Sequence, residues 1–410
     1  MRKFDVVVVG AGQAGAHVAL SLRQDGFQGS IGVIGDEPDL PYERPPLSKA
    51  YLDGSIGADK LLLRPASFWE DQNVEMVLNQ RVVSVDAQRK AVCCQSGDVF
   101  GYQHLVWAAG GRARKLNCPG AELAGVHVVR TRAHTDSLRH ELNACDRIVV
   151  IGGGYIGLET AAVLRKAGKT VTVLEAQERV LARVTSAAVS AYFDQLHRQH
   201  GVVIRTSTQV VALEGNAGRV TSVLLGNEER IDADLVVVGV GLDTEVEPLR
   251  QAGAKCSNGV DVDPYCATSL PDVYAIGDCA NHANEFADGR RLRLESVQNA
   301  NDQARVVAAK IAGAPVAYSA VPWFWSNQYD VRLQTVGLNI GYDETVVRGT
   351  PEAGAFSVVY LRGGKVVALD CINSPRDFVH GKKLVAKGIR ASAEILPGAD
   401  LAQLAVAAPA

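Results

Sequence analysis

Two glycine-rich stretches have the residue types and the spacing to hold the pyrophosphate of a dinucleotide. Residues 5–15 read DVVVVGAGQAG and residues 147–157 read RIVVIGGGYIG, so each places Gly-x-Gly-x-x-Gly directly after a β-branched run. The first glycine makes a tight turn, the second lets the backbone approach a pyrophosphate, and the third allows the following helix to pack closely. The glycines are Gly10, Gly12 and Gly15 in the first copy and Gly152, Gly154 and Gly157 in the second.

Each motif is followed by the remaining parts of a Rossmann βαβ unit. An apolar helical pattern ends at a glycine, Gly26 or Gly168, and the next apolar strand closes on an acid, Asp36 or Glu175. Such an acid accepts hydrogen bonds from a ribose hydroxyl, and the helix N-terminus offers free N–H groups to phosphates. Tight turns without a nucleotide are the alternative, but two complete units favour two dinucleotide sites.

A third stretch, PYERPPLSKAYL (residues 41–52), places two cations on a stiff backbone. Its paired prolines exclude an ordinary helix or central strand through their own positions. Arg44 and Lys49 could therefore hold an anionic group in a fixed pose. On these residues alone, a solvated loop that carries an arginine and a lysine is the better interpretation.

The segments that follow the two units indicate the domain organisation. Two strands end in small residues, at 104–116 and 233–246, and DVYAIGDCA (272–280) places Asp278 after a strand-ending glycine. Beyond Ala314 alternating strand-like segments continue to about residue 372, and a Lys-rich helical segment follows. The predicted fold class is α/β with two Rossmann-like dinucleotide-binding domains, the second inserted in the first, and a C-terminal α+β domain. The predicted bounds are 1–112 and 243–318 for the first dinucleotide-binding domain, 113–242 for the inserted one, and 319–410 for the C-terminal domain.

Composition narrows the class of protein. The chain has 410 residues, 47% of them apolar, and a formal net charge of −3, so it lacks the overall basic charge of a nucleic-acid binder. Glycines and charges interrupt every apolar stretch, and the N-terminal run reads as a strand and not a signal peptide, which predicts a cytoplasmic protein without a membrane span. None of the eight cysteines forms a Cys-x-x-Cys, and no metal site is expected.

The chain resembles the two-dinucleotide-domain flavoprotein reductases, and within them the NADH-dependent ferredoxin reductases of the putidaredoxin reductase and aromatic-ring dioxygenase type. The resemblance covers nearly the whole chain. The motifs that carry it are VVVVGAGQAG, PYERPPLSKAYL, VIGGGYIGLE, VYAIGDCA, ESVQNANDQA and PWFWSNQYD.

The resemblance implies that the first domain, 1–112 and 243–318, binds FAD and that the inserted domain, 113–242, binds NADH. It places Arg44 against phosphate charge and Asp278 at the ribityl and phosphate region of the flavin. Beside the six glycines, the implied cofactor-binding residues are Ala14, Asp36, Arg44, Pro45, Ala109, Tyr155, Ile156, Glu175, Gly241, Asp278, Glu295, Val297 and Trp325.

In this family the lysine of the proline-rich segment, Lys49, pairs with the glutamate of GYIGLE, Glu159. The resemblance therefore implies that Lys49 and Glu159 are the catalytic residues and that they form an ion pair near the reactive edge of the flavin. On spacing alone, Glu159 is equally well explained as an acid placed favourably near a helix N-terminus.

The implied reaction transfers a hydride from NADH to FAD and then single electrons to a small acidic two-iron two-sulfur ferredoxin that feeds an oxygenase. A reductase of rubredoxin or another small carrier would share every motif. A flavoprotein like apoptosis-inducing factor, which binds or signals without turnover, would share the RPPLSK motif. Relatives that reduce disulfides carry a cysteine pair in the FAD domain, and residues 36–60 contain no cysteine.

An acidic, transiently bound ferredoxin needs a local positive surface on this slightly acidic chain. Between Arg362 and Arg390 there are seven Lys or Arg and two Asp or Glu, a local balance of +5. We predict the docking surface there, in the domain that also carries Trp325. The resemblance places Trp325 near the flavin, whereas a packing role in the core of that domain is the alternative.

Overall fold

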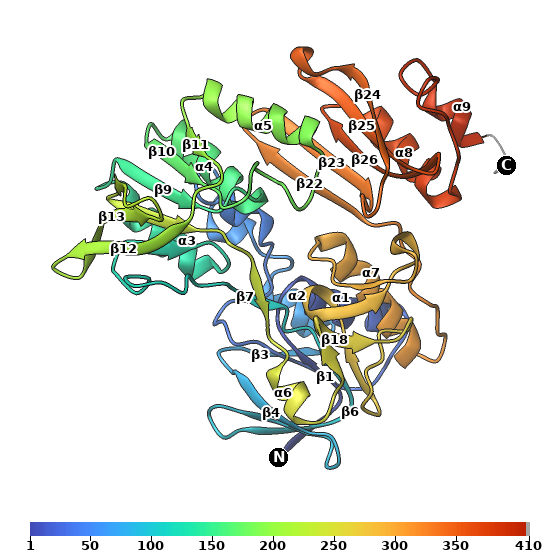
Figure 1. The fold of residues 1–410 in the computed structure, drawn as a ribbon. Coiled ribbons are helices and arrows are strands. Elements are labelled where there is room, and N and C mark those ends of the chain that lie inside the picture. The colour runs from blue at the N-terminus through green and yellow to red at the C-terminus, as the bar shows by residue number, and fades with distance from the viewer. Residues whose placement is uncertain (407–410) are drawn as a thin grey trace. The chain divides into compact units, whose positions relative to one another are not determined.

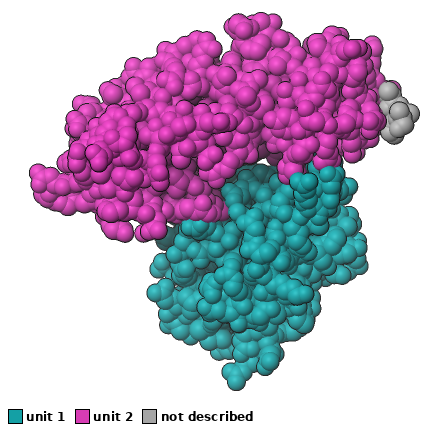
Figure 2. All heavy atoms as spheres, viewed as in Figure 1, with its two compact units in different colours: residues 1–43, 59–112, 243–322 teal, residues 44–58, 113–242, 323–410 magenta. Residues whose placement is uncertain are grey.

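The computed structural model describes residues 1–406, and the last residues of the predicted C-terminal domain, 407–410, lie outside the described part. Figure 1 shows the order of the helices and strands. The chain divides into two compact units (Figure 2). Unit 1 consists of residues 1–43, 59–112 and 243–322, and unit 2 of residues 44–58, 113–242 and 323–410.

A seven-stranded sheet forms the centre of unit 1. Five of its strands run parallel in the order β3-β2-β1-β6-β19, which is the order of a Rossmann sheet, and β5 and β4 extend it as antiparallel strands. The bounds are β1 (Arg2–Val9), β2 (Ile31–Ile34), β3 (Val74–Val77), β4 (Val82–Asp86), β5 (Ala91–Cys94), β6 (Val99–Trp107) and β19 (Val273–Ala275).

The helices of unit 1 cover this sheet. Helices α1 (Gln13–Gln24) and α7 (Val297–Ile311) pack against each other, and their buried alanines and valines share one core with β1 and β2. A smaller four-stranded sheet has the order β17-β18-β20-β21. The remaining elements are α2 (Ala66–Asp71), α6 (Glu247–Gln251), η2 (Ala58–Lys60), η3 (Gly277–Cys279), η4 (Glu285–Ala287), β17 (Cys256–Ser257), β18 (Gly259–Val262), β20 (Ala280–Ala283) and β21 (Arg291–Leu292).

Unit 2 contains a second parallel sheet, in the order β11-β10-β9-β15-β8, and a three-stranded antiparallel sheet, β12-β13-β14. The strands are β8 (Val126–Val128), β9 (Arg147–Ile151), β10 (Thr170–Leu174), β11 (Val203–Arg205), β12 (Val210–Asn216), β13 (Arg219–Leu225), β14 (Arg230–Asp232) and β15 (Leu235–Val238). The helices are α3 (Arg132–Leu142), α4 (Tyr155–Lys166) and α5 (Ala187–Gln199), with η1 (Pro45–Ser48) also in this unit. A short ladder of β7 (Gly111–Ala113) and β16 (Leu242–Thr244) lies where the chain passes between the units.

The third sheet is antiparallel, in the order β22-β23-β26-β25-β24, and it also belongs to unit 2. Its last strand in the chain ends at Ile372, and the predicted Lys-rich helix follows as α8. The bounds are β22 (Trp323–Gln328), β23 (Val331–Gly337), β24 (Glu344–Thr350), η5 (Pro351–Ala353), β25 (Ala355–Arg362), β26 (Lys365–Ile372), α8 (Pro375–Lys387) and α9 (Leu401–Val406).

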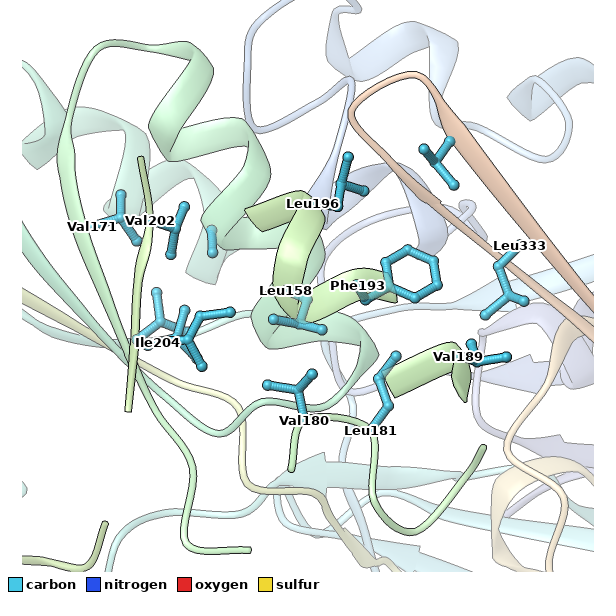
Figure 3. Close-up of a cluster of buried hydrophobic side chains, with 14 of the residues drawn as sticks. Leu158, Val171, Val180, Leu181, Val189, Phe193, Leu196, Val202, Ile204 and Leu333 are labelled. Carbon is cyan, nitrogen blue, oxygen red and sulfur yellow. The ribbon is translucent and has the colours of Figure 1, made fainter. Parts of the chain in front are cut away.

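One hydrophobic core joins the parallel sheet of unit 2 to this third sheet. Phe193 of α5 and Leu333 of β23 are fully buried in the same cluster, and Figure 3 shows the two side chains near each other. The ring centroid of Tyr192 lies 5.1 Å from that of Phe356 on β25. Because both sheets bury their apolar faces in one core, they form a single compact unit.

A cluster of buried polar side chains lies within the same core. The hydroxyls of Thr185 and Tyr360 donate hydrogen bonds to the carboxylate of Asp370, and the Ser186 backbone N–H donates to the Tyr360 hydroxyl at 2.9 Å. Burial raises the pKa of Asp370 to about 6. The cluster ties β25 and β26 to the loop that follows β10.

The two Rossmann-like sheets, together with the antiparallel third sheet and its helices α8 and α9, confirm the predicted fold class. The boundaries between the compact units fall at residues 112, 242 and 322, and residues 44–58 belong to unit 2. The assignment of FAD and NADH to particular domains stays a prediction. Among residues 1–406, no helix has the length and apolar character that a membrane crossing requires. Within the same residues, no group of three or more His, Cys, Asp or Glu could hold a metal ion.

Candidate functional site

The first glycine loop joins β1 to α1 in a conformation that suits a bound phosphate. Gly10 has a φ of +112°, and a Cβ built on Gly15 would lie 1.8 Å from the carbonyl oxygen of Gly10. Gly12 is the N-cap of α1, no side chain in the described part of the chain caps this helix, and its first turn carries no acid. The N–H groups of that turn can therefore bind the pyrophosphate of a dinucleotide.

The second glycine loop, between β9 and α4, repeats this geometry. Gly152 has a φ of +109°, and a Cβ on Gly157 would lie 2.0 Å from the Gly152 carbonyl oxygen. Gly154 is the N-cap, again without a capping side chain among residues 1–406, and a Cβ added there would meet no atom within 4 Å. The loop thus leaves room for a phosphate at the helix N-terminus. Both loops therefore fit the pyrophosphate that the two implied cofactors have in common.

The two acids lie where the second strand of each unit ends. Asp36 follows β2, and 60% of its side chain is exposed. Glu175 follows β10 directly and is buried against the second glycine loop. Its carboxylate accepts hydrogen bonds from the Gly153 N–H at 2.7 Å and the Gln177 N–H at 2.8 Å. Glu175 is therefore held in place before any ribose arrives.

Arg179, four residues after Glu175, is bound to its own loop. Its guanidinium donates to the carbonyl oxygens of Ala182 at 3.0 Å and Ser186 at 3.3 Å, and to the hydroxyl of Ser190. These contacts direct the guanidinium toward residues 182–190. An arginine near this acid could have bound a 2′-phosphate of the nucleotide, but the Arg179 guanidinium already donates to three protein groups.

In unit 1 the structure brings several predicted FAD-site residues to the end of the sheet where β1 and β6 finish. A Cβ on Gly10 would meet the backbone N of Ala109 at 2.9 Å, and a Cβ on Gly277 would meet Ala14 at 3.2 Å. Asp278 lies beside Gly277 in η3, whose Gly277 N–H donates to Gln303 of α7 at 2.7 Å. Val297 begins α7, and the nearby Glu295 forms an ion pair with Arg293 at 2.7 Å.

In unit 2 the structure brings Lys49 and Glu159 together. The Lys49 ammonium contacts Oε2 of Glu159 and also donates to the Pro45 carbonyl oxygen at 3.0 Å. The Glu159 side chain is 1% exposed and the Lys49 side chain 19% exposed. A buried carboxylate needs such a partner, because an unpaired charge in the interior is costly.

Two serines complete the surroundings of Glu159. The Ser48 hydroxyl donates to Oε2 at 2.7 Å, and the Ser326 hydroxyl on β22 donates to Oε1 at 2.7 Å. Neither serine was singled out from the sequence, although both lie in quoted motifs, RPPLSK and PWFWSNQYD. A serine carries no pattern that reveals its partner, so no sequence signal could have found them.

The remaining predicted residues of unit 2 lie on several elements. Arg44 donates to the Arg130 carbonyl oxygen at 2.7 Å. Tyr155 begins α4 with its ring 4.7 Å from that of Phe324 on β22, and Ile156 follows it with 43% exposure. Gly241 has a φ of +116°. The half-buried Trp325 lies on β22.

Residues 4–304 match the family described as pyridine nucleotide-disulphide oxidoreductase, and residues 323–405 match the reductase C-terminal family. The chain belongs to the pyridine nucleotide-disulphide oxidoreductases. Family membership assigns FAD and NAD(P)H as its cofactors. The eight cysteines of this oxidoreductase are all free thiols.

The chain is similar over nearly its whole length to reductases of small electron carriers. The chain is 56% identical to a ferredoxin–NAD(P)(+) reductase of Sphingomonas sp over 396 residues, which cover 96% of this chain and 95% of the relative. It is 53% identical to a 5,5'-dehydrodivanillate O-demethylase ferredoxin reductase subunit of a Sphingobium species, covering 98% and 97%. The solved covalent complex of putidaredoxin reductase and putidaredoxin matches with a TM-score of 0.94 and 39% identity, covering 98% of each chain.

Proposed function

We propose that this oxidoreductase is an NADH-dependent ferredoxin reductase that transfers a hydride from NADH to FAD and single electrons to a [2Fe-2S] ferredoxin feeding an oxygenase. The observation that carries the proposal is that one chain presents two glycine loops at helix N-termini that no side chain of residues 1–406 caps, each followed by an acid at the end of the next strand. A hydride donor and a hydride acceptor can therefore bind to the same protein. The names of the full-length relatives support the choice of ferredoxin as electron acceptor.

The chain supplies binding, orientation and electrostatics for this reaction. Bound FAD would accept the hydride and release two electrons singly, which is the chemistry of the flavin itself. The first loop with Asp36 and Asp278 would hold FAD, and the second loop with Glu175 would hold NADH. Lys49, fixed by Glu159 and the Pro45 carbonyl, would present a cation that needs no reorganisation when negative charge develops. A cytoplasmic location, where NADH is available, belongs to the same proposal.

Steady-state reduction of a supplied ferredoxin by NADH tests the proposed function. We expect NADH-dependent turnover with a [2Fe-2S] ferredoxin, and ferricyanide measures hydride transfer independently of docking. Rubredoxin turnover faster than that of every ferredoxin tried would favour the alternative carrier. FAD reduction by NADH without turnover of any carrier would instead favour the binding or signalling flavoprotein.

We predict that Trp325→Ala lowers ferredoxin turnover about tenfold, because an aromatic contact of about 1.4 kcal/mol is removed at the electron exit. Trp323 and Trp325 lie on one face of β22 with ring centroids 5.7 Å apart. Because Trp323 packs on Phe378 and Lys382 of α8, the matched control for lost packing is Tyr342→Ala, whose ring centroid lies 5.0 Å from that of Tyr360. Unchanged turnover and an unchanged flavin absorption spectrum in Trp325→Ala would reject the role.

The segment between Arg362 and Arg390 presents more positive charge than its composition suggests. Of its two acids, Asp370 is buried and Asp377 forms an ion pair with Arg348 at 3.2 Å. Lys383 is exposed, while Lys387 donates to the Ala405 carbonyl oxygen at 2.8 Å. These observations support a docking surface on and near α8.

Charge reversal at Lys382, Lys383 and Lys387 is expected to raise the KM for ferredoxin about tenfold and to flatten its dependence on ionic strength. Activity with ferricyanide should stay at the wild-type level. Reversal at Lys60, Arg89 and Lys255, three exposed cations of unit 1, makes the same change in net charge and is the control. Equal effects of the two triple variants would place docking elsewhere.

A further inference from the structure

The Glu159 carboxylate is held at both of its oxygens by different parts of unit 2. Oε2 faces Lys49 and Ser48 of the proline-rich segment, whereas Oε1 accepts from Ser326 of β22 at 2.7 Å. With a donor on each oxygen, the carboxylate plane is fixed. Loss of the Ser326 hydroxyl would leave a buried oxygen without that donor.

The Ser326 hydroxyl is itself oriented by a directed chain of hydrogen bonds. The side-chain amide of Gln328 donates to Ser326 Oγ at 3.2 Å, which leaves the hydroxyl proton of Ser326 to point at Glu159. The Gln328 carbonyl oxygen lies 2.9 Å from Nε2 of the fully buried His197 on α5. Burial lowers the pKa of His197 to about 4, so this ring is neutral and Nε2–H is the donor to Gln328.

Strand β22 supplies the residues of this series of hydrogen bonds because side chains alternate between the two faces of a strand. Phe324, Ser326 and Gln328 share one face of β22, and Phe324 packs on Tyr155 while the two polar residues reach Glu159 and His197. The antiparallel ladder pairs Ser326 with Leu333 and Gln328 with Val331. A side chain on a hydrogen-bonded strand is a more rigid support than one on a loop.

We propose that Ser326 and Gln328 are positioning residues of the hydride-transfer site, which act on Lys49 by fixing the Glu159 carboxylate. The inference rests on the proposed function, because the pair of Lys49 and Glu159 must serve hydride transfer. It assigns to the C-terminal sheet a part in the NADH reaction, in addition to the docking of the electron acceptor.

Single-turnover reduction of bound FAD by NADH tests this proposal in Ser326→Ala and Gln328→Met. We expect the limiting rate to fall about tenfold in both variants, since a lost buried donor misplaces its acceptor. The FAD content and the Kd for NADH should stay within twofold of wild type. Ser326→Thr retains the hydroxyl and should recover most of the rate. Ser357→Ala removes another fully buried serine of the same sheet and should behave as wild type.

A coupling measurement separates positioning from general loss of structure. If Ser326 acts through Glu159, Ser326→Ala should add no further loss of rate in a Glu159→Gln background. Wild-type reduction in Ser326→Ala, beside slow reduction in Glu159→Gln, would overturn the positioning role and leave the proposed function intact. A slow Ser326→Ala that Ser326→Thr does not rescue would also overturn it, by showing a structural effect. Wild-type rates in Lys49→Met and Glu159→Gln would overturn both the positioning role and the proposed role of the ion pair.

Discussion

Replacing Lys49 by Met or Glu159 by Gln is expected to slow the reduction of bound flavin by NADH about 100-fold, the cost of misplacing one charged group at a reacting centre. FAD should stay bound, because neither residue belongs to the first glycine loop. Stopped-flow absorbance of the flavin in a single turnover gives the rate directly. Lys60→Met, at an exposed lysine, is the control for loss of one positive charge.

The double variant distinguishes catalysis from stability in this pair. Lys49→Met alone leaves the carboxylate of Glu159 buried with only hydroxyl donors, which should lower the free energy of unfolding by about 3 kcal/mol. Adding Glu159→Gln removes that charge, so most of the stability should return while flavin reduction stays slow. If the rate recovered together with the stability, the pair would be a structural feature. Wild-type rates in both single variants would refute the role directly.

We expect kcat/KM for NADH to exceed that for NADPH by at least about 100-fold, since like charges 4 Å apart repel by about 4 kcal/mol near a protein surface. We expect Glu175 to be the source of this repulsion, because it is fixed beside the second glycine loop by two backbone N–H groups. Arg179 does not offset it, since its guanidinium is bound to residues 182–190. The measurement is steady-state turnover with both nucleotides and a saturating electron acceptor.

Glu175→Gln should reduce the ratio of the two kcat/KM values, mainly by raising that for NADPH. Glu178→Gln removes an exposed acid three residues further along the chain and should leave the ratio unchanged. Equal kcat/KM for NADH and NADPH in the wild-type protein would overturn the assignment of Glu175.

Much of the fold could be predicted from local patterns. Strands β1 and β9, the two glycine loops and the acids Asp36 and Glu175 are read directly, because a tight turn and a helix N-terminus depend on residues close in sequence. The end of the third sheet at Ile372 and the helix that follows it were also predicted correctly from alternation and composition. The grouping of residues 44–58 with unit 2 is visible only in the tertiary structure, because no local pattern records which core a loop joins.

The sequence by itself determined the two dinucleotide loops, their acids and the fold class, because each depends on residue types at short, fixed spacings. Only the tertiary structure decided how the site around Glu159 is assembled. Lys49 and Ser326 lie 110 and 167 residues from Glu159, and chain folding alone brings their donors to its two oxygens. The same holds for Arg179, whose side chain could have faced a phosphate or its own loop. Burial and hydrogen bonding to residues 182–190 decide that orientation.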